Sequence, residues 1–506
     1  MLDWTQLSIS EPIRQALDEM GFETPTRIQQ EVLPVAIFKK LDVFGAAETG
    51  SGKTLAFLIP ILENLIQADE AIKGMKKPPK HRYMSALILA PTRELVMQIH
   101  NEFKNIAKHT TYKSVAVIGG MSEEKQERLL NKCPHVVIAT PGRYWALCQK
   151  NEYAGDFTHL RNFVVDEIDR MVEKGHYKEV ENILECIHAN ELPKLQTMVF
   201  SATLTFIVLP NPGRAQKTRE EKLREISKAM QMRANYKLVD LTNEFATPQS
   251  LTERRICCAN LLEKDTNLYF TLISYQARTL VFTNSIDSAQ RLHRLLVTLN
   301  FKPRPMILHA KMQEKKRLKN LEKFAQIPNS VLLATDVAAR GLDIKNIENV
   351  IHYQIPRTAE EYIHRSGRTA RASRAGMSVM LLDPQDVARY RKICKNLKRN
   401  QELPLLEVDN SKRMAAITRR VHLATELERL DYQLRKVSSR KGWEVKMAEA
   451  ADLLLSDEEM SDPEDDAKNK NRLKKSAENA LKSALGQPLP KSTLSIIGPT
   501  NMKGVI

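Results

Sequence analysis

The chain lacks the features of secreted, zinc-binding and membrane-spanning proteins. Its six cysteines form no Cys-x-x-Cys pair and show no zinc-finger spacing. We therefore expect free, buried thiols in a reducing compartment instead of a disulfide framework or structural zinc. The sequence contains no run of about 18 apolar residues and no signal-peptide pattern. These absences predict a soluble intracellular protein with no membrane partner.

Length and charge limit the class of protein further. The 506 residues exceed one ordinary domain, and the 42% apolar content is too high for a globally disordered chain. The formal net charge of +16 favours a polyanionic partner, because lysine and arginine release counterions when they bind phosphate backbones. Taken alone, the same excess also fits a basic tail or a solvated surface.

Short apolar strands alternate with helical patterns in two successive trains, which is typical of parallel α/β sheets. The expected strands of the first train are 42–46, 86–90, 115–118, 136–139, 163–166 and 198–201, and those of the second are 279–283, 305–309, 331–335, 350–353 and 378–382. We therefore expect an α/β fold with domains at 1–245 and 253–400, joined by a polar linker at 243–252.

Charged segments stand apart from these trains. Residues 214–232 carry apolar positions at helical spacing and predict an inserted helix after the last strand of the first train. From about residue 401 the strand pattern stops, and a basic helical stretch (412–446), an acidic run (457–466) and a lysine-rich run (468–475) follow. Such charge blocks are usually solvated. We expect residues 401–506 to form a charged extension, helical and in part disordered.

A phosphate-binding loop lies between a strand pattern and a helix pattern in the first train. It consists of Ala47, Glu48, Thr49, Gly50, Ser51, Gly52, Lys53 and Thr54. In this context backbone N–H groups and a helix N-terminus cradle phosphates, Lys53 reaches the β- and γ-phosphates, and the Thr54 hydroxyl binds Mg²⁺. The usual pattern begins with Gly, where this chain has Ala47. The loop predicts binding and hydrolysis of a nucleotide.

Carboxylates follow the apolar strand at 163–166, in the sequence V-V-D-E-I-D. A carboxylate at the carboxyl end of a parallel strand beside such a loop is placed to hold nucleotide-bound Mg²⁺. We assign that role, through water, to Asp166, and we assign Glu167 as the base that activates the attacking water. Acidic clusters at strand ends also serve as turns and caps, but the phosphate-binding loop favours the catalytic interpretation.

The motifs together resemble those of DEAD-box ATP-dependent RNA helicases of superfamily 2, from Trp4 to about Leu382. G-F-E-T-P-T-R-I-Q at 21–29 is similar to the family's Q motif, with Trp4 as the upstream aromatic. The resemblance implies ATP as the nucleotide, with Gln29 reading the adenine edge and Phe22 covering the ring. A core role for Phe22 is the alternative.

The resemblance also implies RNA contacts in the first domain. Three motifs carry them: Pro91, Thr92 and Arg93; Gly119 and Gly120; and Thr140, Pro141, Gly142 and Arg143. N–H groups at glycine turns and helix starts, together with arginines, bind phosphates without reading bases. S-A-T at 201–203 resembles the motif that couples nucleotide state to domain movement, through Ser201, Thr203 and the carboxylate of Asp169.

Three second-domain segments, 281–285, 334–343 and 364–371, resemble the family's fourth, fifth and sixth motifs. The resemblance implies that Arg368 and Arg371 are arginine fingers that neutralise charge on the transferring phosphoryl group. It further implies that Asp343 contacts the nucleotide and that Thr335 contacts RNA. Arginines three residues apart are also ordinary on a solvated helix face.

The chain departs from the family pattern at several positions. The family is named after the sequence D-E-A-D, and this chain has Ile168 in place of the Ala, which predicts a packing effect. Glu314 stands where the family usually has Gln, and this acidic residue puts the RNA contact of that position in doubt. Ser366 and Ala370 replace a common Ile and a common Gly. These last two, the run at 170–177 and the inserted helix resemble a nucleolar subgroup linked to assembly of the large ribosomal subunit. That likeness implies a nuclear, nucleolar protein, with ribosomal RNA or its precursors and assembly factors as partners.

The sequence therefore predicts a monomeric enzyme with two RecA-like domains facing each other across a cleft, ATP and Mg²⁺ between them and RNA across both. Its expected function is ATP-driven remodelling or local unwinding of RNA. Two rivals remain: a catalytically weak RNA-binding scaffold of the same fold, and a DNA-unwinding ATPase. RNA-stimulated ATP turnover and a comparison of RNA with DNA substrates separate them.

Overall fold

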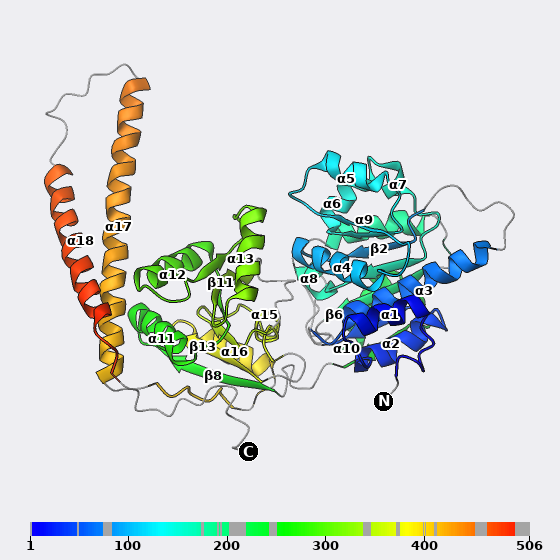
Figure 1. The fold of residues 1–506 in the computed structure, drawn as a ribbon, viewed down its shortest axis with the longest axis horizontal. Helices are drawn as coiled ribbons and strands as arrows, with labels where there is room; N and C mark the ends of the chain where they lie inside the picture. Colours follow the sequence, from blue (N-terminus) through cyan, green and yellow to red (C-terminus); the bar gives the residue numbers. More distant parts are fainter. Residues whose placement is uncertain are drawn as a thin grey trace. The chain divides into compact units, whose positions relative to one another are not determined.

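The computed structural model of the chain describes residues 3–47, 50–73, 83–173, 177–189, 192, 195–201, 219–241, 250–336, 346–370, 375–397, 399, 401–408, 412–450 and 463–490. These residues form two compact units, one before position 242 and one after position 249. Each unit is built on its own sheet, and all the strands of each sheet are parallel (Figure 1).

The first unit has a seven-stranded sheet in the order β3-β4-β2-β5-β6-β1-β7. Its strands are β1 (Val43–Ala46), β2 (Ala86–Leu89), β3 (Ser114–Val117), β4 (Val136–Ala139), β5 (Asn162–Val165), β6 (Gln196–Ser201) and β7 (Lys237–Asp240). Its helices are α1 (Glu11–Glu19), α2 (Arg27–Ile37), α3 (Lys53–Lys73), α4 (Arg93–Ile106), α5 (Glu123–Leu130), α6 (Pro141–Cys148), α7 (Glu152–Gly155), α8 (Ile168–Glu173), α9 (Tyr177–His188) and α10 (Arg219–Ala229).

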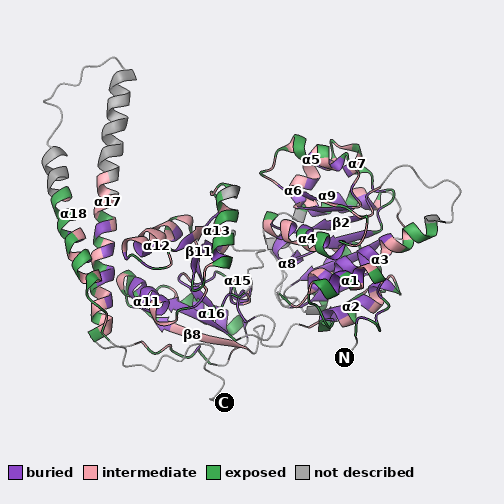
Figure 2. Cartoon of the chain, in the orientation of Figure 1, coloured by how far each residue is buried: buried purple, intermediate pink, exposed green. Residues whose placement is uncertain are grey.

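Both faces of this sheet are buried, because successive residues of a strand point to opposite faces and here both sets are apolar. One core joins α1 to α4 with strand residues such as Val43 and Ile88. The other joins α6, α9 and α10 with their neighbours Phe44 and Leu87. Figure 2 shows the result as a buried sheet under partly exposed helices. Ile168 lies fully buried in the second core, so the expected packing effect stays a prediction about a core position.

The second unit has a six-stranded sheet in the order β10-β11-β9-β12-β13-β8. Its strands are β8 (Leu251–Cys257), β9 (Thr279–Thr283), β10 (Met306–Leu308), β11 (Val331–Thr335), β12 (Asn349–His352) and β13 (Gly376–Leu382). Its helices are α11 (Leu261–Ser274), α12 (Ile286–Thr298), α13 (Glu314–Gln326), α15 (Ala359–Ser366), α16 (Val387–Asn396), α17 (Lys412–Ala450) and α18 (Pro463–Gly486).

The expected strands are all present, with bounds that shift by at most two residues. One strand in each sheet, β7 and β8, was not predicted, and both lie at sheet edges. β8 begins at Leu251, so the end of the expected linker at 243–252 belongs to the second sheet. The missed strands carry charged and half-exposed residues, since an edge strand has only one neighbour to pack against.

The C-terminal helices are part of the second unit's core. Four buried residues of α17 lie at helical spacing and join the apolar side chains of α11 and α12: Ile417, Val421, Ala424 and Leu427. Ala477 and Leu481 of α18 complete this cluster. Treating the charge blocks as solvated was therefore wrong for this part of the extension, where the charged residues cover only part of each helix.

The thiols differ in exposure. All six cysteines are free; Cys258 and Cys394 are buried, Cys257 is exposed, and the other three are half-buried. The expectation of free thiols is confirmed, but burial holds for only two of them. Across the described ranges, no helix is both long enough and apolar enough to cross a membrane.

Candidate active site and RNA-contact edge

The predicted catalytic residues meet at the carboxyl edge of the first sheet. The phosphate-binding loop follows β1, Asp166 follows β5 directly, and Ser201 ends β6. These three strands are neighbours in the order β5-β6-β1. Because parallel strands all end at the same edge, the topology brings together residues more than 100 positions apart in the sequence.

The phosphate-binding loop connects β1 to the first turn of α3. Gly50 and Gly52 have φ angles of +86° and +93°, a region that favours glycine because it has no Cβ. Ala47 N–H donates to the Ser201 carbonyl oxygen at 3.2 Å. Lys53 begins α3, is almost fully buried, and its Nζ donates to the Ala47 carbonyl oxygen. Burial lowers the pKa of Lys53, while the carboxylates that follow β5 oppose that shift.

The carboxylates after β5 form a buried group. Asp166, Glu167 and Asp169 are each at most 5% exposed. Glu167 has a φ of +51°, a left-handed conformation that costs about 1–3 kcal/mol for a residue other than glycine and is concentrated at functional sites. Its N–H donates to Asp166 Oδ1 at 2.9 Å, and Arg170 Nε lies 3.4 Å from its Oε2. The backbone strain thus occurs at the residue assigned as the base.

Asp166 carries the clearest electrostatic signal in the site. Burial, followed by the charge of Glu167, raises its pKa to about 7, and the charge of Lys53 only partly opposes this shift. The charge of Lys53 is thus not enough to offset the burial of this carboxylate beside Glu167. A divalent ion beside Asp166 would supply the additional positive charge.

The residues present fit Mg²⁺ carried in with a nucleotide. Asp166 and Thr54 offer hard oxygen donors, and Mg²⁺ is usually held by one or two carboxylates together with water and substrate phosphates. Among the residues that the structure places, no group of three or more His, Cys, Asp or Glu could hold a metal.

Gln29, one of the two predicted adenine-binding residues, contacts the phosphate-binding loop. Gln29 is 2% exposed; its Oε1 accepts from Thr26 N–H at 2.8 Å, and its Nε2 donates to the Gly52 carbonyl oxygen at 3.0 Å. A side-chain amide has two donors and two lone pairs, so one of each remains for a base edge. A Cβ on Gly52 would lie 2.6 Å from Gln29 Nε2, so this approach requires glycine.

Phe22 is 38% exposed, which excludes the core role considered for it. Its carbonyl oxygen accepts from the indole N–H of buried Trp4 at 2.8 Å. The upstream aromatic therefore fixes the backbone of the segment that presents the Phe22 ring.

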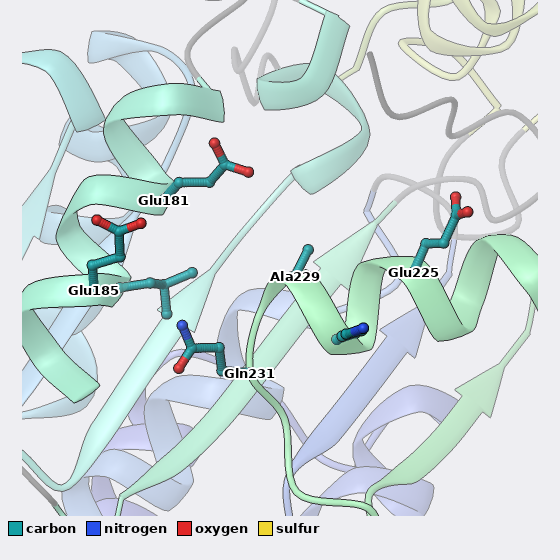
Figure 3. Close-up of a pocket in the computed structure, with 7 residues that line it drawn as sticks. Glu181, Glu185, Glu225, Ala229 and Gln231 are labelled. Atoms are coloured by element: carbon teal, nitrogen blue, oxygen red, sulfur yellow. The ribbon is translucent and has the colours of Figure 1, made fainter. Parts of the chain in front are cut away.

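A pocket of about 390 Å³ lies elsewhere in the first unit, between α9 and α10 (Figure 3). Glu181 and Glu185 come from α9, and Glu225 comes from α10. These acidic groups disfavour phosphate binding. This pocket is therefore not the nucleotide site.

The predicted RNA motifs occupy the other half of the same carboxyl edge, after β2, β3 and β4. Thr92 caps α4, its Oγ1 accepting from Leu95 N–H at 3.3 Å, and Thr140 precedes α6, which begins with Pro141. A Cβ on Gly119 would lie 3.0 Å from the Arg93 guanidinium, and Gly120 has a φ of +84°. Two helix N-termini and a glycine turn therefore present N–H groups at one edge.

Gly142 and Arg143 belong to the same predicted RNA motif as Thr140 and Pro141. Arg143 Nη1 lies 3.2 Å from Glu123 Oε2, and that carboxylate also accepts from Lys150. Pro91 is buried before Thr92. The expected RNA contacts of the first unit thus lie side by side, next to the nucleotide half of the sheet.

In the second unit, Arg365 connects the ends of three strands. It is 1% exposed and donates to Asp336 after β11, to the Gln354 carbonyl oxygen after β12 and to Asn284 Oδ1 after β9, at 2.5–2.7 Å. No role for Arg365 was predicted from the sequence. The sequence feature that could have indicated this role is the position of Arg365 within the sixth motif.

Arg368 is buried one turn after His364, to whose carbonyl oxygen its Nε donates at 3.3 Å. Thr335 is buried at the end of β11. Thr203, Asp343 and Arg371 lie outside the described residues, as do Glu48 and Thr49. The assignments of all five therefore stay predictions.

The two departures in the sixth motif have local explanations. Ser366 forms a buried polar cluster with His352 and Ser378, with contacts of 3.0–3.2 Å. An isoleucine would leave the histidine and the other serine with one partner fewer. Ala370 has a φ of +56°, a conformation that glycine adopts at lower cost, so this chain accepts strain where the family commonly has glycine.

The fold and the site define a nucleotide hydrolase with two tandem α/β units. Residues 26–209 match the model of the DEAD/DEAH box helicases, and residues 263–373 match that of the helicase conserved C-terminal domain. The human ATP-dependent RNA helicase DDX24 is 35% identical, over 96% of this chain and 71% of that protein. The ATP-dependent RNA helicase mak5 of Schizosaccharomyces pombe is 36% identical, over 93% and 71%. The chain belongs to the DEAD-box family of ATP-dependent RNA helicases.

Solved structures agree in fold. The DEAD-box helicase Mss116 bound to single-stranded RNA and UDP-BeF has a TM-score of 0.70 at 22% identity, with 97% of this chain and 94% of that one covered. Dbp5 of S. cerevisiae bound to RNA and ADP BeF3 has a TM-score of 0.67 at 21% identity, with 83% and 99% covered. The predicted RecA-like tandem fold and the identification as an ATPase that binds nucleotide are confirmed.

Proposed function

We propose that this helicase hydrolyses ATP with Mg²⁺ at the β5-β6-β1 edge and remodels RNA held along the β3-β4-β2 edge. The observation that carries the proposal is the meeting of Lys53, Asp166 and a strained Glu167 at one sheet edge. Family membership supports the chemistry, and the positions of the predicted RNA motifs after β2, β3 and β4 support RNA binding at the same sheet edge.

Each group of residues has a separate role in the proposed reaction. The N–H groups of residues 47–52 and the Lys53 ammonium hold the phosphates, and Gln29 and Phe22 hold the adenine. Mg²⁺, held by Thr54 and Asp166, would neutralise charge on the β- and γ-phosphates. Glu167 orients and deprotonates the attacking water. Arg368 and Arg371 of the second unit complete the reaction by stabilising charge on the transferring group, and Asp343 contacts the nucleotide.

RNA is bound through its backbone by the motifs at Thr92, Gly119 and Thr140, together with Thr335 of the second unit. Ser201, Thr203 and Asp169 connect the nucleotide state to RNA binding. We further propose that the RNA is ribosomal RNA or its precursors, that the chain acts as a monomer, and that it works in the nucleolus with assembly factors of the large subunit. The similarity to the ATP-dependent RNA helicases DDX24 and mak5 supports RNA as the substrate, and the departures at Ser366 and Ala370 support the nucleolar subgroup.

Steady-state ATPase assays with structured RNA, with duplex DNA and without nucleic acid test the function. We expect stimulation by RNA only. Glu167→Gln should keep ATP and RNA binding but lose turnover, while the exposed control Glu152→Gln should match the wild type. Near-normal turnover of Glu167→Gln would overturn the assigned base. In cells, depletion should lower large ribosomal subunits relative to small ones, and an unchanged ratio would contradict the ribosomal role.

A further inference from the structure

Gln126 of α5 is a fully buried polar side chain without a role in the proposed reaction. Its Oε1 accepts from Ile118 N–H at 2.9 Å, and its Nε2 donates to the carbonyl oxygens of Ile118 and Met121 at 3.0 and 3.1 Å. A side-chain amide has two donor hydrogens and two lone pairs, so most of its hydrogen-bonding capacity is used. All of these bonds go to backbone groups of one short segment, residues 118–121.

That segment contains the glycine turn that is predicted to contact RNA. Ile118 follows β3 directly, so Gln126 bonds the backbone on both sides of Gly119 and Gly120. Gly120 is exposed and has a φ of +84°, a conformation that residues with a Cβ rarely adopt. The amide therefore holds a turn of unusual backbone conformation at the predicted RNA-contact edge.

The other predicted RNA motifs of the first unit also meet around α5. Glu123, the first residue of this helix, accepts from Lys150 and lies 3.2 Å from Arg143 of the motif at 140–143. The guanidinium of Arg93, from the motif at 91–93, lies so close to Gly119 that a Cβ there would be 3.0 Å from it. The turn that Gln126 holds is thus in contact with a second RNA motif.

Apolar packing alone does not explain a glutamine at this position. Gln126 and Leu130 are the two buried residues of α5, one helical turn apart. A buried amide loses hydration that a methionine of similar shape does not, and its hydrogen bonds only compensate for that loss. What the amide adds to an apolar side chain is a fixed position of the turn relative to the helix.

We propose that Gln126 is a positioning residue for RNA binding, which keeps the turn at Gly119 and Gly120 in the conformation that contacts the phosphodiester backbone. The inference rests on the proposed function, since it deepens the RNA site of the same enzyme. Gln126 is fully buried and acts through the turn. Without the amide the turn adopts other conformations as well, and RNA affinity falls in proportion to the fraction of molecules in the binding conformation.

The test compares Gln126→Met with a matched control, Gln196→Met, in the full chain. Gln196 is 2% exposed; its Nε2 donates to the carbonyl oxygens of Ala36 and Leu41 at 3.0 and 2.7 Å, and its Oε1 accepts from Asn162 Nδ2 at 3.0 Å. It is the first residue of β6, so it lies at the amino edge of the sheet. The two substitutions remove the same chemistry from opposite edges of one unit.

The main measurement is ATPase activity at saturating ATP over a range of oligouridine concentrations. If the binding conformation falls to about one-tenth of the molecules, Gln126→Met should raise the RNA concentration for half-maximal stimulation roughly tenfold. Its kcat and its KM for ATP, both at saturating RNA, should stay within about twofold of the wild type. Gln196→Met should leave all three quantities within about twofold, although urea unfolding should show that both variants lose stability.

Hydrogen exchange without RNA tests the cause directly. A peptide that contains residues 118–121 should exchange faster in Gln126→Met and should be unchanged in Gln196→Met, because only the first substitution frees Ile118 N–H. If Gln126→Met does not fold, Gln126→Ala makes the same predictions, since the smaller side chain leaves space for water to bond to the freed backbone groups.

An unchanged half-saturating RNA concentration in the folded Gln126 variant overturns the inference. An equal rise in the Gln196 control also overturns it, because lost stability would then account for both. RNA stimulation of the wild-type ATPase is measured in the same series. Absence of that stimulation refutes the proposed function itself, whereas stimulation with an unchanged half-saturation in the variant refutes only the role of Gln126.

Discussion

Asp166→Asn should make the ligand-free protein more stable while it abolishes ATP turnover. The buried carboxyl has a pKa of about 7 in the folded chain, against 3.8 as its ordinary value. A group whose pKa is raised by folding binds more protons in the folded state. The unfolding free energy therefore falls as pH rises from about 4 to 7, and the loss is complete above 7.

The size of the effect follows from the shift of roughly three pH units, each corresponding to about 1.4 kcal/mol, or about 4 kcal/mol in all. Asparagine does not ionise and escapes this penalty. The stability of Asp166→Asn relative to the wild type should therefore increase by about 4 kcal/mol between pH 4 and pH 8. Turnover should be lost because asparagine is a weaker, uncharged ligand for Mg²⁺.

Urea unfolding followed by tryptophan fluorescence measures this difference. The three tryptophans are Trp4, Trp145 and Trp443. In a Trp443→Phe background the signal reports the first unit alone, which contains Asp166. A stability difference that does not change with pH would refute the argument, because only ionisation of Asp166 makes it depend on pH.

Three further substitutions probe other parts of the chain. Lys53→Ala should abolish productive ATP binding in a fluorescent-nucleotide titration, whereas substitution of the exposed Lys39, which precedes β1, by Ala should leave it unchanged. Arg371→Ala should lower turnover on the order of 10³-fold with little change in ATP affinity, because an arginine finger acts on transition-state charge; equal losses in both would argue against that role. Ile417→Ala should destabilise the second unit by about 2–5 kcal/mol, since the side chain is fully buried. Its exposed neighbour Arg419→Ala should change stability by less than about 0.5 kcal/mol.

Much of the fold could be predicted because parallel strands buried on both faces read as apolar runs. β2 and β4 are fully buried and stood out for that reason. β7 has two exposed residues out of four, and only one residue of β8 is fully buried, so neither produced such a run. The apolar positions of α17 were present in the sequence, but the charged residues around them concealed a spacing that packs against α11 and α12.

The candidate site was predicted as a set of residues but not as a network. The loop before Lys53 and the carboxylates after β5 were recognisable from their positions at strand ends. The contact of Gln29 with Gly52 and the role of Arg365 depend on loops that are remote in sequence. Likewise, the left-handed backbone of Glu167 follows from the tertiary structure around it, and no local pattern indicates it.

The packing of α17 and α18 also sets where the second unit can be cut. The matched helicase model ends at residue 373, yet the apolar cluster continues through Leu481 to the half-buried Leu489. A fragment ending near residue 400 would expose the side chains of α11 and α12 that α17 covers, and exposed apolar surface of this kind promotes aggregation. Truncation there would thus confuse loss of an RNA contact with loss of a folded unit. The hairpin belongs to the smallest piece of this chain that can be expected to fold as a second domain.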